Sequence, residues 1–292
     1  MSVKLFTDAS SFFPIDLAKK ENVVLLESIV MMGDKHYREI SELNREDFIN
    51  SLESIDPYPT STQVPASDVL DELNKAIEEG YDEILYLVVS TNLSNAMNSM
   101  NIASKKVKDK IKVTIYQTDY TCTAQGAMTY RAWTMLKDGK STEEIVKVLD
   151  YVKEKTYSIG VSGSFFALFR TGKVKKGAAI SILSSALKMK PLAEINTTDG
   201  VIGVGAGLGF KSAIKKMVKH IKENTDPDMT YDLFLSDALN KELLKQYEAA
   251  IMKNRRIEKS YHWDLTAVVA LTIGKGSVMM AITPSEKELE KL

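Results

Sequence analysis

Two short runs of hydroxyl and amide side chains are the parts of this sequence best suited to chemistry. They occupy residues 60–63 and 90–95, and each precedes a segment with helical spacing of apolar residues. Backbone N–H groups at the start of a helix carry a positive partial charge, so such a run favours an anion. Taken alone, either run is explained more simply as Ser or Thr capping its helix. Two such runs in one α/β unit favour a shared anion site.

A glycine-rich segment at 201–216 is a second candidate, because its glycines at every second position precede a helical pattern. The spacing fits neither the G-x-G-x-x-G dinucleotide fingerprint nor the G-x-x-x-x-G-K-S/T phosphate loop. A permissive turn, or a strand packed tightly against a neighbour, is the better interpretation.

Residues that could bind a metal or act as nucleophiles are scattered along the chain. His36, His220 and His262 are far apart in sequence, and Cys122 is the only cysteine. No metal-ligand spacing and no ordered set of Ser, His and Asp is visible, so we predict no metal site, no cofactor and no catalytic triad. Cys122 fits a small buried core residue better than a nucleophile.

An alternation of strand-like and helix-like segments must position these groups. Apolar strand-like runs at 3–8, 83–89 and 111–116 are each followed by a helix-like segment. A further strand is predicted at 23–30 and a hairpin at 32–37. This alternation predicts an α/β fold with a mostly parallel sheet and helices on both faces. In such a sheet, ligands gather beyond the carboxyl ends of the strands.

Helix starts are visible beside both polar runs. Ser94 is a natural N-cap for the helix that follows the second run, and Ser67 or Asp68 for the helix that follows the first. Ser141, with Glu144 three residues later, has the arrangement of a capping box.

The character of the sequence changes near residue 156. We predict an N-terminal α/β domain over 1–157 and a second α/β domain over 158–292, with helices near 211–223 and 240–254. An apolar stretch follows the boundary. Its Phe and Met residues belong by default to a core, and they would also suit a tunnel for hydrocarbon.

Composition excludes several classes of protein. The 292 residues include 38 Lys+Arg and 39 Asp+Glu, a net charge of −1, which argues against a general nucleic-acid binder. No run approaches the ~18 consecutive apolar residues of a membrane span, and the first residues do not read as a signal peptide. One cysteine excludes an internal disulfide, so a cytoplasmic location is the simplest expectation.

Three blocks of the sequence resemble motifs of the DegV family, which includes the fatty-acid-binding subunits of bacterial fatty acid kinase. The family's D-S-T-A-D-x-P is similar to residues 8–14 (DASSFFP), its T-S-Q-P-S to residues 61–65 (STQVP), and its S-S-x-L-S-G-T-Y to residues 90–97 (STNLSNAM). The interval between the last two blocks needs no gap. The likeness runs from end to end of the chain.

This resemblance implies a two-domain, bacterial binding protein that holds a long-chain fatty acid and is not an enzyme. In the family the carboxylate sits on two hydroxyls, which correspond here to Ser61 and Ser94. A Ser in place of the family's Thr at the first position keeps the hydroxyl donor. Further polar residues expected around the carboxylate are Thr62, Thr91, Asn95 and Thr272. The acyl tail is expected between the domains, against residues that include Phe165, Phe166, Leu168 and Met189.

Departures from the family motifs concern basic residues. Lys173, Leu208 and Thr272 stand where the family has Arg, Arg and His. Head-group binding and delivery to an acyl-processing partner remain the expectation. The chain therefore lacks the Arg and His side chains that would support docking of an acyl kinase.

Two other kinds of function stay open. An enzyme acting on a small phosphorylated or carboxylated metabolite could use the same polar runs, and the glycine-rich segment would suit it. A structural or regulatory interaction protein would bind no small molecule. Thermal-shift screening with lipids, nucleotides and sugar phosphates separates the three, because a true ligand stabilises the fold by mass action.

Overall fold

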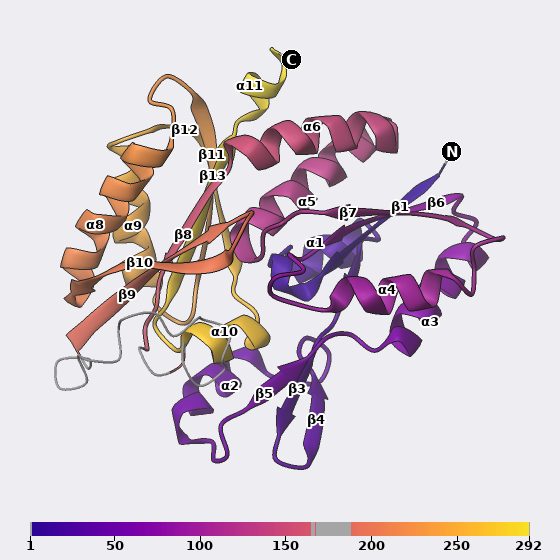
Figure 1. The fold of residues 1–292 in the computed structure, drawn as a ribbon, viewed down its shortest axis with the longest axis horizontal. Helices are drawn as coiled ribbons and strands as arrows, with labels where there is room; N and C mark the ends of the chain where they lie inside the picture. The colour runs from indigo at the N-terminus through magenta and orange to yellow at the C-terminus, as the bar shows by residue number, and fades with distance from the viewer. Residues whose placement is uncertain (1, 165–166, 168–187, 292) are drawn as a thin grey trace.

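The N-terminal half is built on a four-stranded parallel sheet. In the computed structural model, which describes residues 2–164, 167 and 188–291, the strand order is β2-β1-β6-β7 (Figure 1). Every residue of β6 is buried, as expected of a parallel strand covered on both faces. The four strands are β1 (Val3–Asp8), β2 (Val24–Leu26), β6 (Glu83–Val88) and β7 (Lys112–Gln117).

Helices cover both faces of this sheet. Tyr86 of β6 belongs to a buried cluster with α3 (Ala66–Glu78) and α4 (Ala96–Ser104). Its neighbour Leu87 points the other way and packs in the cluster that contains α5 (Cys122–Lys137). The two directions follow from the alternation of side chains along a strand. The predicted parallel sheet with helices on both faces is therefore confirmed.

A separate three-stranded sheet differs from the prediction of one strand over 23–30. That segment divides into β2 and β3, and β3 pairs antiparallel with β4 and with β5. The division occurs at Glu27, whose carboxylate accepts hydrogen bonds from the backbone N–H groups of Ile40 and Ser41 and holds the chain away from the parallel sheet. The predicted hairpin at 32–37 is confirmed as the β3–β4 connection. The strands are β3 (Ile29–Met32), β4 (Lys35–Arg38) and β5 (Thr60–Thr62).

The C-terminal half is built on a six-stranded mixed sheet, in the order β10-β9-β8-β13-β11-β12. Neighbouring strands are antiparallel, except for the parallel pair β11–β12. The α/β character expected of this half is confirmed. The strands are β8 (Tyr157–Val161), β9 (Met189–Asn196), β10 (Gly200–Leu208), β11 (Thr230–Asp237), β12 (Arg256–Asp264) and β13 (Val278–Pro284).

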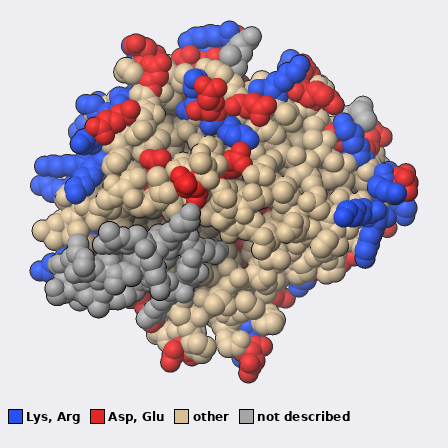
Figure 2. All heavy atoms as spheres, viewed as in Figure 1, with Lys and Arg blue, Asp and Glu red and all other residues tan. Residues whose placement is uncertain are grey.

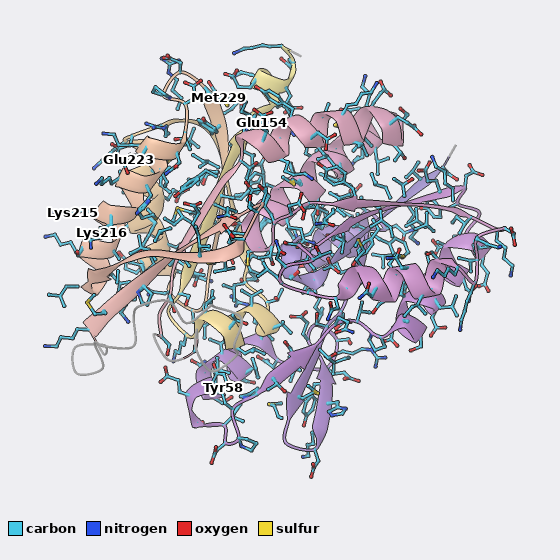
Figure 3. All side chains as sticks on the ribbon, viewed as in Figure 1. Tyr58, Glu154, Lys215, Lys216, Glu223 and Met229 are labelled. Atoms are coloured by element: carbon cyan, nitrogen blue, oxygen red, sulfur yellow. The ribbon has the colours of Figure 1, made fainter. Side chains whose placement is uncertain are left out.

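Helices flank this second sheet as well (Figure 1). α8 (Gly209–Asn224) and α9 (Lys241–Met252) contact it on the side away from the N-terminal half. Lys215 and Glu223 lie on the solvent side of α8 (Figure 3). α6 (Thr142–Lys155) contacts β13 from the opposite side, and it begins with the predicted capping box.

The glycine-rich run is a strand, not a phosphate loop. A Cβ atom at Gly207 of β10 would overlap the backbone N of Ala213 on α8. The missing side chain lets the helix pack directly on the strand. Tight packing against a neighbour, the preferred interpretation of these glycines, is confirmed at this position.

Short elements complete the described fold. Of these, α10 was not predicted, because its run of β-branched residues reads as a strand when burial is unknown. It lies between β12 and β13 in the sequence. These elements are α1 (Ile15–Lys20), α2 (Arg45–Ser51), α10 (Ala267–Ile273), α11 (Glu286–Leu289) and the 3₁₀ turns η1 (Ala9–Ser11) and η2 (Leu52–Ser54).

Helix α5 lies between the two sheets (Figure 1). It contacts β1 and β6 of the parallel sheet and also β8, β11 and β13 of the mixed sheet. At Gly126 a Cβ atom would overlap both the backbone carbonyl oxygen of Ser11 and the ring of Trp263. The glycine is therefore needed where the helix is packed from both sides. The predicted division at 157/158 falls after the first residue of β8 and stays a prediction.

Charged side chains lie mostly around the rim of the face shown in Figure 2, and uncharged residues cover much of its middle. Blue side chains gather at the edge formed by α8. Among the described residues, no helix has both the length and the apolar character that a membrane crossing requires.

Candidate functional site

A cavity of about 280 Å³ lies between the two halves of the molecule. Its volume is close to the lower end of the roughly 300–1,000 Å³ typical of small-molecule sites. One part of the lining is polar and comes from the N-terminal half: Asp8, Ser10, Ser28, Ser61, Thr62, Gln63, Ser94, Asn95 and Thr121. We call these residues the polar wall.

The part of the lining that comes from the C-terminal half is mainly apolar, with Ser162 and Thr272 as its polar side chains. We call its apolar residues the apolar wall: Ala193, Ile195, Val201, Val268, Val269, Ile273 and Met279. Space for the Met279 side chain depends on Gly160, because a Cβ there would overlap the Met279 sulfur. The cavity therefore offers hydrogen-bonding groups mostly from the N-terminal half and hydrocarbon mostly from the C-terminal half.

The polar wall forms where the order of the parallel sheet reverses. From β1 the chain continues to β2 on one side, whereas β6 and β7 lie on the other. Loops that leave β1 and β6 therefore diverge and open a crevice beyond the carboxyl ends of these strands. Asp8 is the last residue of β1, and Val89 follows the end of β6. Both line the cavity, as expected of a ligand site in such a sheet.

The two predicted head-group residues, Ser61 and Ser94, line the same cavity. Ser61 is in β5, opposite Val30 of β3. Ser94 lies in the turn before α4, where its hydroxyl accepts a hydrogen bond from the backbone N–H of Ala96 at 3.2 Å. The helix begins at Ala96 with Asn95 as its N-cap, so the predicted cap, Ser94, lies one residue before the observed one. α3 likewise begins after Pro65, ahead of Ser67 and Asp68.

Of the further residues expected around the head group, Thr62, Asn95 and Thr272 also line the cavity. Thr272 donates a hydrogen bond to the carbonyl oxygen of Val268 at 3.2 Å. Thr91 is not among the lining residues, which differs from the expectation. It is exposed, and its hydroxyl accepts a hydrogen bond from Gln117 at 3.2 Å.

The residues expected around the tail have a different outcome. Phe165, Phe166, Leu168 and the substituted Lys173 lie outside the described residues. Met189 is half-buried at the start of β9 and is not in the lining, which begins about 13 Å further along that strand at Ala193. The apolar wall was missed, because its residues come from strands and a helix that are far apart in sequence.

Asp8 is a buried carboxyl in the polar wall, with 4% of its surface exposed. It accepts hydrogen bonds from the Tyr86 hydroxyl, from the backbone N–H of Val89 at 2.6 Å and from the Gln125 side-chain amide at 3.0 Å. Burial raises the pKa of Asp8 to about 6, and these hydrogen bonds limit the rise. Sequence reasoning quoted Asp8 in a motif without assigning it to the site.

Glu39 is a second buried carboxyl, placed behind the apolar wall. It accepts hydrogen bonds from the backbone N–H of Val268 at 3.1 Å and of Ser28 at 3.3 Å. Burial raises its pKa to about 7. Tyr58 adds a second link to the same helix, because its hydroxyl donates to the carbonyl oxygen of Leu271 at 2.7 Å (Figure 3). Both residues hold α10 against the N-terminal half.

The turn between β9 and β10 rests on the loop at 90–95. The side-chain amide of Asn92 donates a hydrogen bond to the carbonyl oxygen of Thr198 at 3.0 Å. A Cβ at Gly200 would lie 3.1 Å from the Leu93 side chain. The two contacts hold this turn beside Leu93 and Val201, which both line the cavity.

Candidates for metal chemistry do not gather at the cavity. Within the described parts of the chain, no group of three or more His, Cys, Asp or Glu side chains is placed to hold a metal ion. Cys122 is buried and lines the cavity at the start of α5.

Comparison with known proteins gives a consistent result. A family profile described as "Uncharacterised protein, DegV family" matches residues 2–285. A DegV domain-containing protein of Clostridium perfringens is 25% identical over 289 residues, which cover 96% of this chain and 98% of the relative.

Two solved structures have the same fold. A DegV lipid binding protein from Thermotoga maritima superposes with a TM-score of 0.86 at 22% identity, covering 97% of this chain and 99% of that one. A DegV family protein from Thermus thermophilus, described for its fatty acid binding, gives a TM-score of 0.87 at 21% identity, with coverage of 98% and 100%.

Proposed function

This chain belongs to the DegV family, and from that premise we propose that it binds a long-chain fatty acid without converting it. The acid head lies on the hydroxyls of Ser61 and Ser94, and the tail lies between the two halves. Relatives described as lipid-binding or fatty-acid-binding support the choice of ligand.

One observation carries the proposal: the cavity joins a wall of hydroxyl and amide groups to a wall of hydrocarbon. A molecule with a small polar head and an apolar tail is complementary to both walls. A nucleotide or sugar phosphate would leave polar groups against the apolar wall, and such groups are costly to bury without partners. The arrangement therefore favours a lipid over a small metabolite.

The energetics of such a site depend mainly on the tail. A 16-carbon tail buries about 15 methylene-like groups at about 0.8 kcal/mol each, so its transfer contributes at most about 12 kcal/mol. Association and ordering oppose this by several kcal/mol. A hydrogen bond from one serine hydroxyl adds about 1 kcal/mol. The tail thus sets affinity, and the two serines set the position of the head.

The role we propose is that of a carrier that delivers the acid to an acyl-processing partner, with no cofactor. Leu208, which stands where the family motif has Arg, is 68% exposed and offers hydrocarbon at the end of β10. A partner that recognises basic groups finds fewer of them there, so an acceptor other than the family's kinase fits better. The single cysteine suits a reducing cytoplasm.

Mass spectrometry after denaturing extraction tests the proposal. Protein purified without added lipid is expected to carry about one long-chain fatty acid per chain. Ser61→Ala combined with Ser94→Ala removes both hydroxyl donors, and we expect affinity for added oleate to fall by about tenfold or more.

A matched control is available in the same two segments. Thr60 and Thr91 are exposed hydroxyl residues that do not line the cavity. Thr60→Ala combined with Thr91→Ala is expected to leave affinity within about twofold of the unchanged protein. Equal loss in both double variants would contradict the assignment of the head. A protein that is empty and also ignores added oleate would defeat the proposal.

A further inference from the structure

Asp8 gives the head-group end of the cavity an unusual charge. Among the described residues that line the cavity, it is the one Asp, Glu, Lys, Arg or His. Its three hydrogen-bond donors, a tyrosine hydroxyl, a backbone N–H and a side-chain amide, are all neutral. No ion pair within the described parts of the chain involves Asp8. A negative charge on Asp8 is therefore stabilised by dipoles and not cancelled by a cation.

Among the residues that the structure describes, the immediate surroundings of Asp8 add no further charge. On the neighbouring strands, Leu26 of β2 lies opposite Asp8, and β6 presents the Tyr86 hydroxyl. From α5, Gln125 is neutral, and Cys122 is the titratable side chain in the same lining. The Tyr86 hydroxyl keeps its proton, because burial and the adjacent Asp8 raise its pKa well above the ordinary value.

A fatty acid whose head meets Ser61 and Ser94 places a second carboxyl in the cavity that Asp8 lines. Two carboxylates in one buried site cannot both ionise without a large cost, so such a pair holds one proton. The proton lets one carboxyl donate a hydrogen bond to the other. The uncharged head of an alcohol can make the same hydrogen bond to Asp8, because its hydroxyl group is also a donor.

We infer that the cavity selects an uncharged head group: a fatty acid binds with one proton shared between its carboxyl and Asp8, and a long-chain alcohol binds in the same place. This inference rests on the proposed function and specifies the chemical class of its ligand. No covalent bond forms or breaks. The proton comes from solution and returns to it when the ligand leaves.

The proton balance has a measurable consequence. Unliganded Asp8 has a pKa of about 6, so above that pH both Asp8 and the free acid are ionised before they meet. Binding then takes up about one proton, and the dissociation constant of the acid rises by up to about tenfold per pH unit. Below pH 6 Asp8 is already protonated, so the slope becomes shallower. An alcohol of the same length carries no charge and lacks this slope.

Calorimetric titration of the unchanged protein with dodecanoic acid and with 1-dodecanol, both below their aggregation limits, tests the inference. Between pH 6.5 and 8.5 we expect the dissociation constant of the acid to rise by a factor of at least about 30, and that of the alcohol to change by less than about threefold. Buffers with different heats of ionisation report the uptake of the proton directly.

Asp8→Asn separates the role of Asp8 from general effects of pH. The amide oxygen accepts from Val89 and Gln125, and the amide N–H₂ donates to the Tyr86 hydroxyl oxygen, so the local hydrogen bonds can be kept. In the Asp8→Asn variant we expect that the dissociation constant of the acid no longer rises with pH. Asp232→Asn is the matched control, because Asp232 is also a buried carboxyl with a pKa raised to about 6 but does not line the cavity. In the Asp232→Asn variant we expect the dissociation constant of the acid to rise with pH as it does in the unchanged protein.

The outcomes distinguish this inference from the function on which it rests. If the acid binds with the same affinity from pH 6.5 to 8.5, the shared proton is wrong and fatty-acid binding stands. If Asp8→Asn folds and keeps the full slope, another group takes up the proton and Asp8 is excluded. If neither ligand binds at any pH, both proposals fail. Should the variant fail to fold, the comparison of acid and alcohol on the unchanged protein decides the matter.

Discussion

The two walls of the cavity are made in different ways. The polar wall comes mostly from the ends of the parallel strands and the loops beyond them, and Ser61 and Thr62 are added by the short strand β5. The apolar wall comes from regular elements: the inward side chains of β9, β10 and β13, and one side of α10. Loops can place several hydrogen-bond donors at one point, whereas strands and helices present continuous hydrocarbon.

This difference separates two properties of the site. Changes in the loops should alter which head group is accepted, because the donors and Asp8 are there. Changes in the strands and in α10 should alter how much hydrocarbon is held. Each wall also has one buried carboxyl nearby, Asp8 in the polar wall and Glu39 behind the apolar wall. Ligand series and pH can therefore test the two walls independently.

The largest loss of stability is expected at Gly126, where elements of both halves pack against one residue. Gly126→Ala places a methyl group against the backbone of Ser11 and the ring of Trp263. Because a backbone oxygen cannot move aside as a flexible side chain can, we expect the free energy of unfolding to fall by about 3 kcal/mol or more. Urea denaturation measures it. The matched control is Gly203→Ala, where the added methyl group meets nothing within 4 Å; a similar loss there would contradict the explanation.

The two buried carboxyls should make stability depend on pH in a recognisable direction. Their pKa values are raised on folding, to about 6 for Asp8 and about 7 for Glu39, so the folded state binds more protons than the unfolded state above about pH 4.5. Their contribution is complete below the unfolded values and is lost as the pH rises through 6 and 7.

Between pH 5 and pH 7.5 we therefore expect Asp8 and Glu39 to lower the free energy of unfolding of the unliganded protein by about 3 kcal/mol, with urea midpoints as the measurement. Asp232, whose pKa is also raised to about 6, adds a further fall in the same direction. Carboxyls with lowered pKa values, such as Glu248, titrate below this window and do not offset the change. Asp8→Asn should remove part of the fall. A free energy of unfolding that rises steadily from pH 5 to 7.5 would show that the pKa values of both carboxyls are not raised on folding.

Truncating the apolar wall should reduce affinity without changing head selectivity. Val201→Ala combined with Val269→Ala removes methyl groups from the hydrocarbon side of the cavity. We expect binding of the C12 acid and the C12 alcohol to weaken equally, by about 1 to 2 kcal/mol. The Ser61→Ala and Ser94→Ala double variant is expected instead to keep the gain per added methylene. Titration with C10, C12 and C14 ligands measures both. If the valine variant changed the ratio of the affinity for the acid to the affinity for the alcohol, the apolar wall would also affect head selectivity, which would contradict the separation of the two walls.

The smallest effect concerns the contact between the two walls. Asn92→Ala removes the hydrogen bond from the loop at 90–95 to Thr198 in the β9–β10 turn. Since both residues are exposed, we expect a loss of only about 0.5 kcal/mol, seen as a small drop in Tm. Asn98→Ala, at an exposed position on α4, serves as the control and should cause no loss. A drop larger than that of Gly126→Ala would overturn this ranking.

The part of the polar wall in the two polar runs could be predicted from sequence, whereas Asp8, Ser10, Ser28 and Thr121 and the whole apolar wall could not. The serines lie in two short runs beside recognisable helix starts, so local pattern is enough to find them. The buried run at 84–88 and the capping box at Ser141 are equally local, and both are as predicted. The family resemblance added the identity of the head group, which remains a prediction for these residues.

Tertiary contacts decide the features that were missed. The break in the predicted strand at 23–30 depends on Glu27 accepting hydrogen bonds from residues beyond β4. α10 forms a helix in a β-branched run because burial and the Glu39 contact hold it there. Ile195 and Met279 line the same cavity only because β9 and β13, which are distant in sequence, both pair with β8. None of these contacts leaves a periodic signal in the chain.

Because α5 lies between the two sheets, the rotation of this helix about its axis decides which of its side chains face each sheet. One extra residue inserted within Cys122–Lys137 would turn everything after it by about 100° and advance it by about 1.5 Å. The side chains that now face β13 would then point away from it, although every other residue of the protein stayed the same. Length variation should therefore be tolerated in the loops at either end of this helix and not within it.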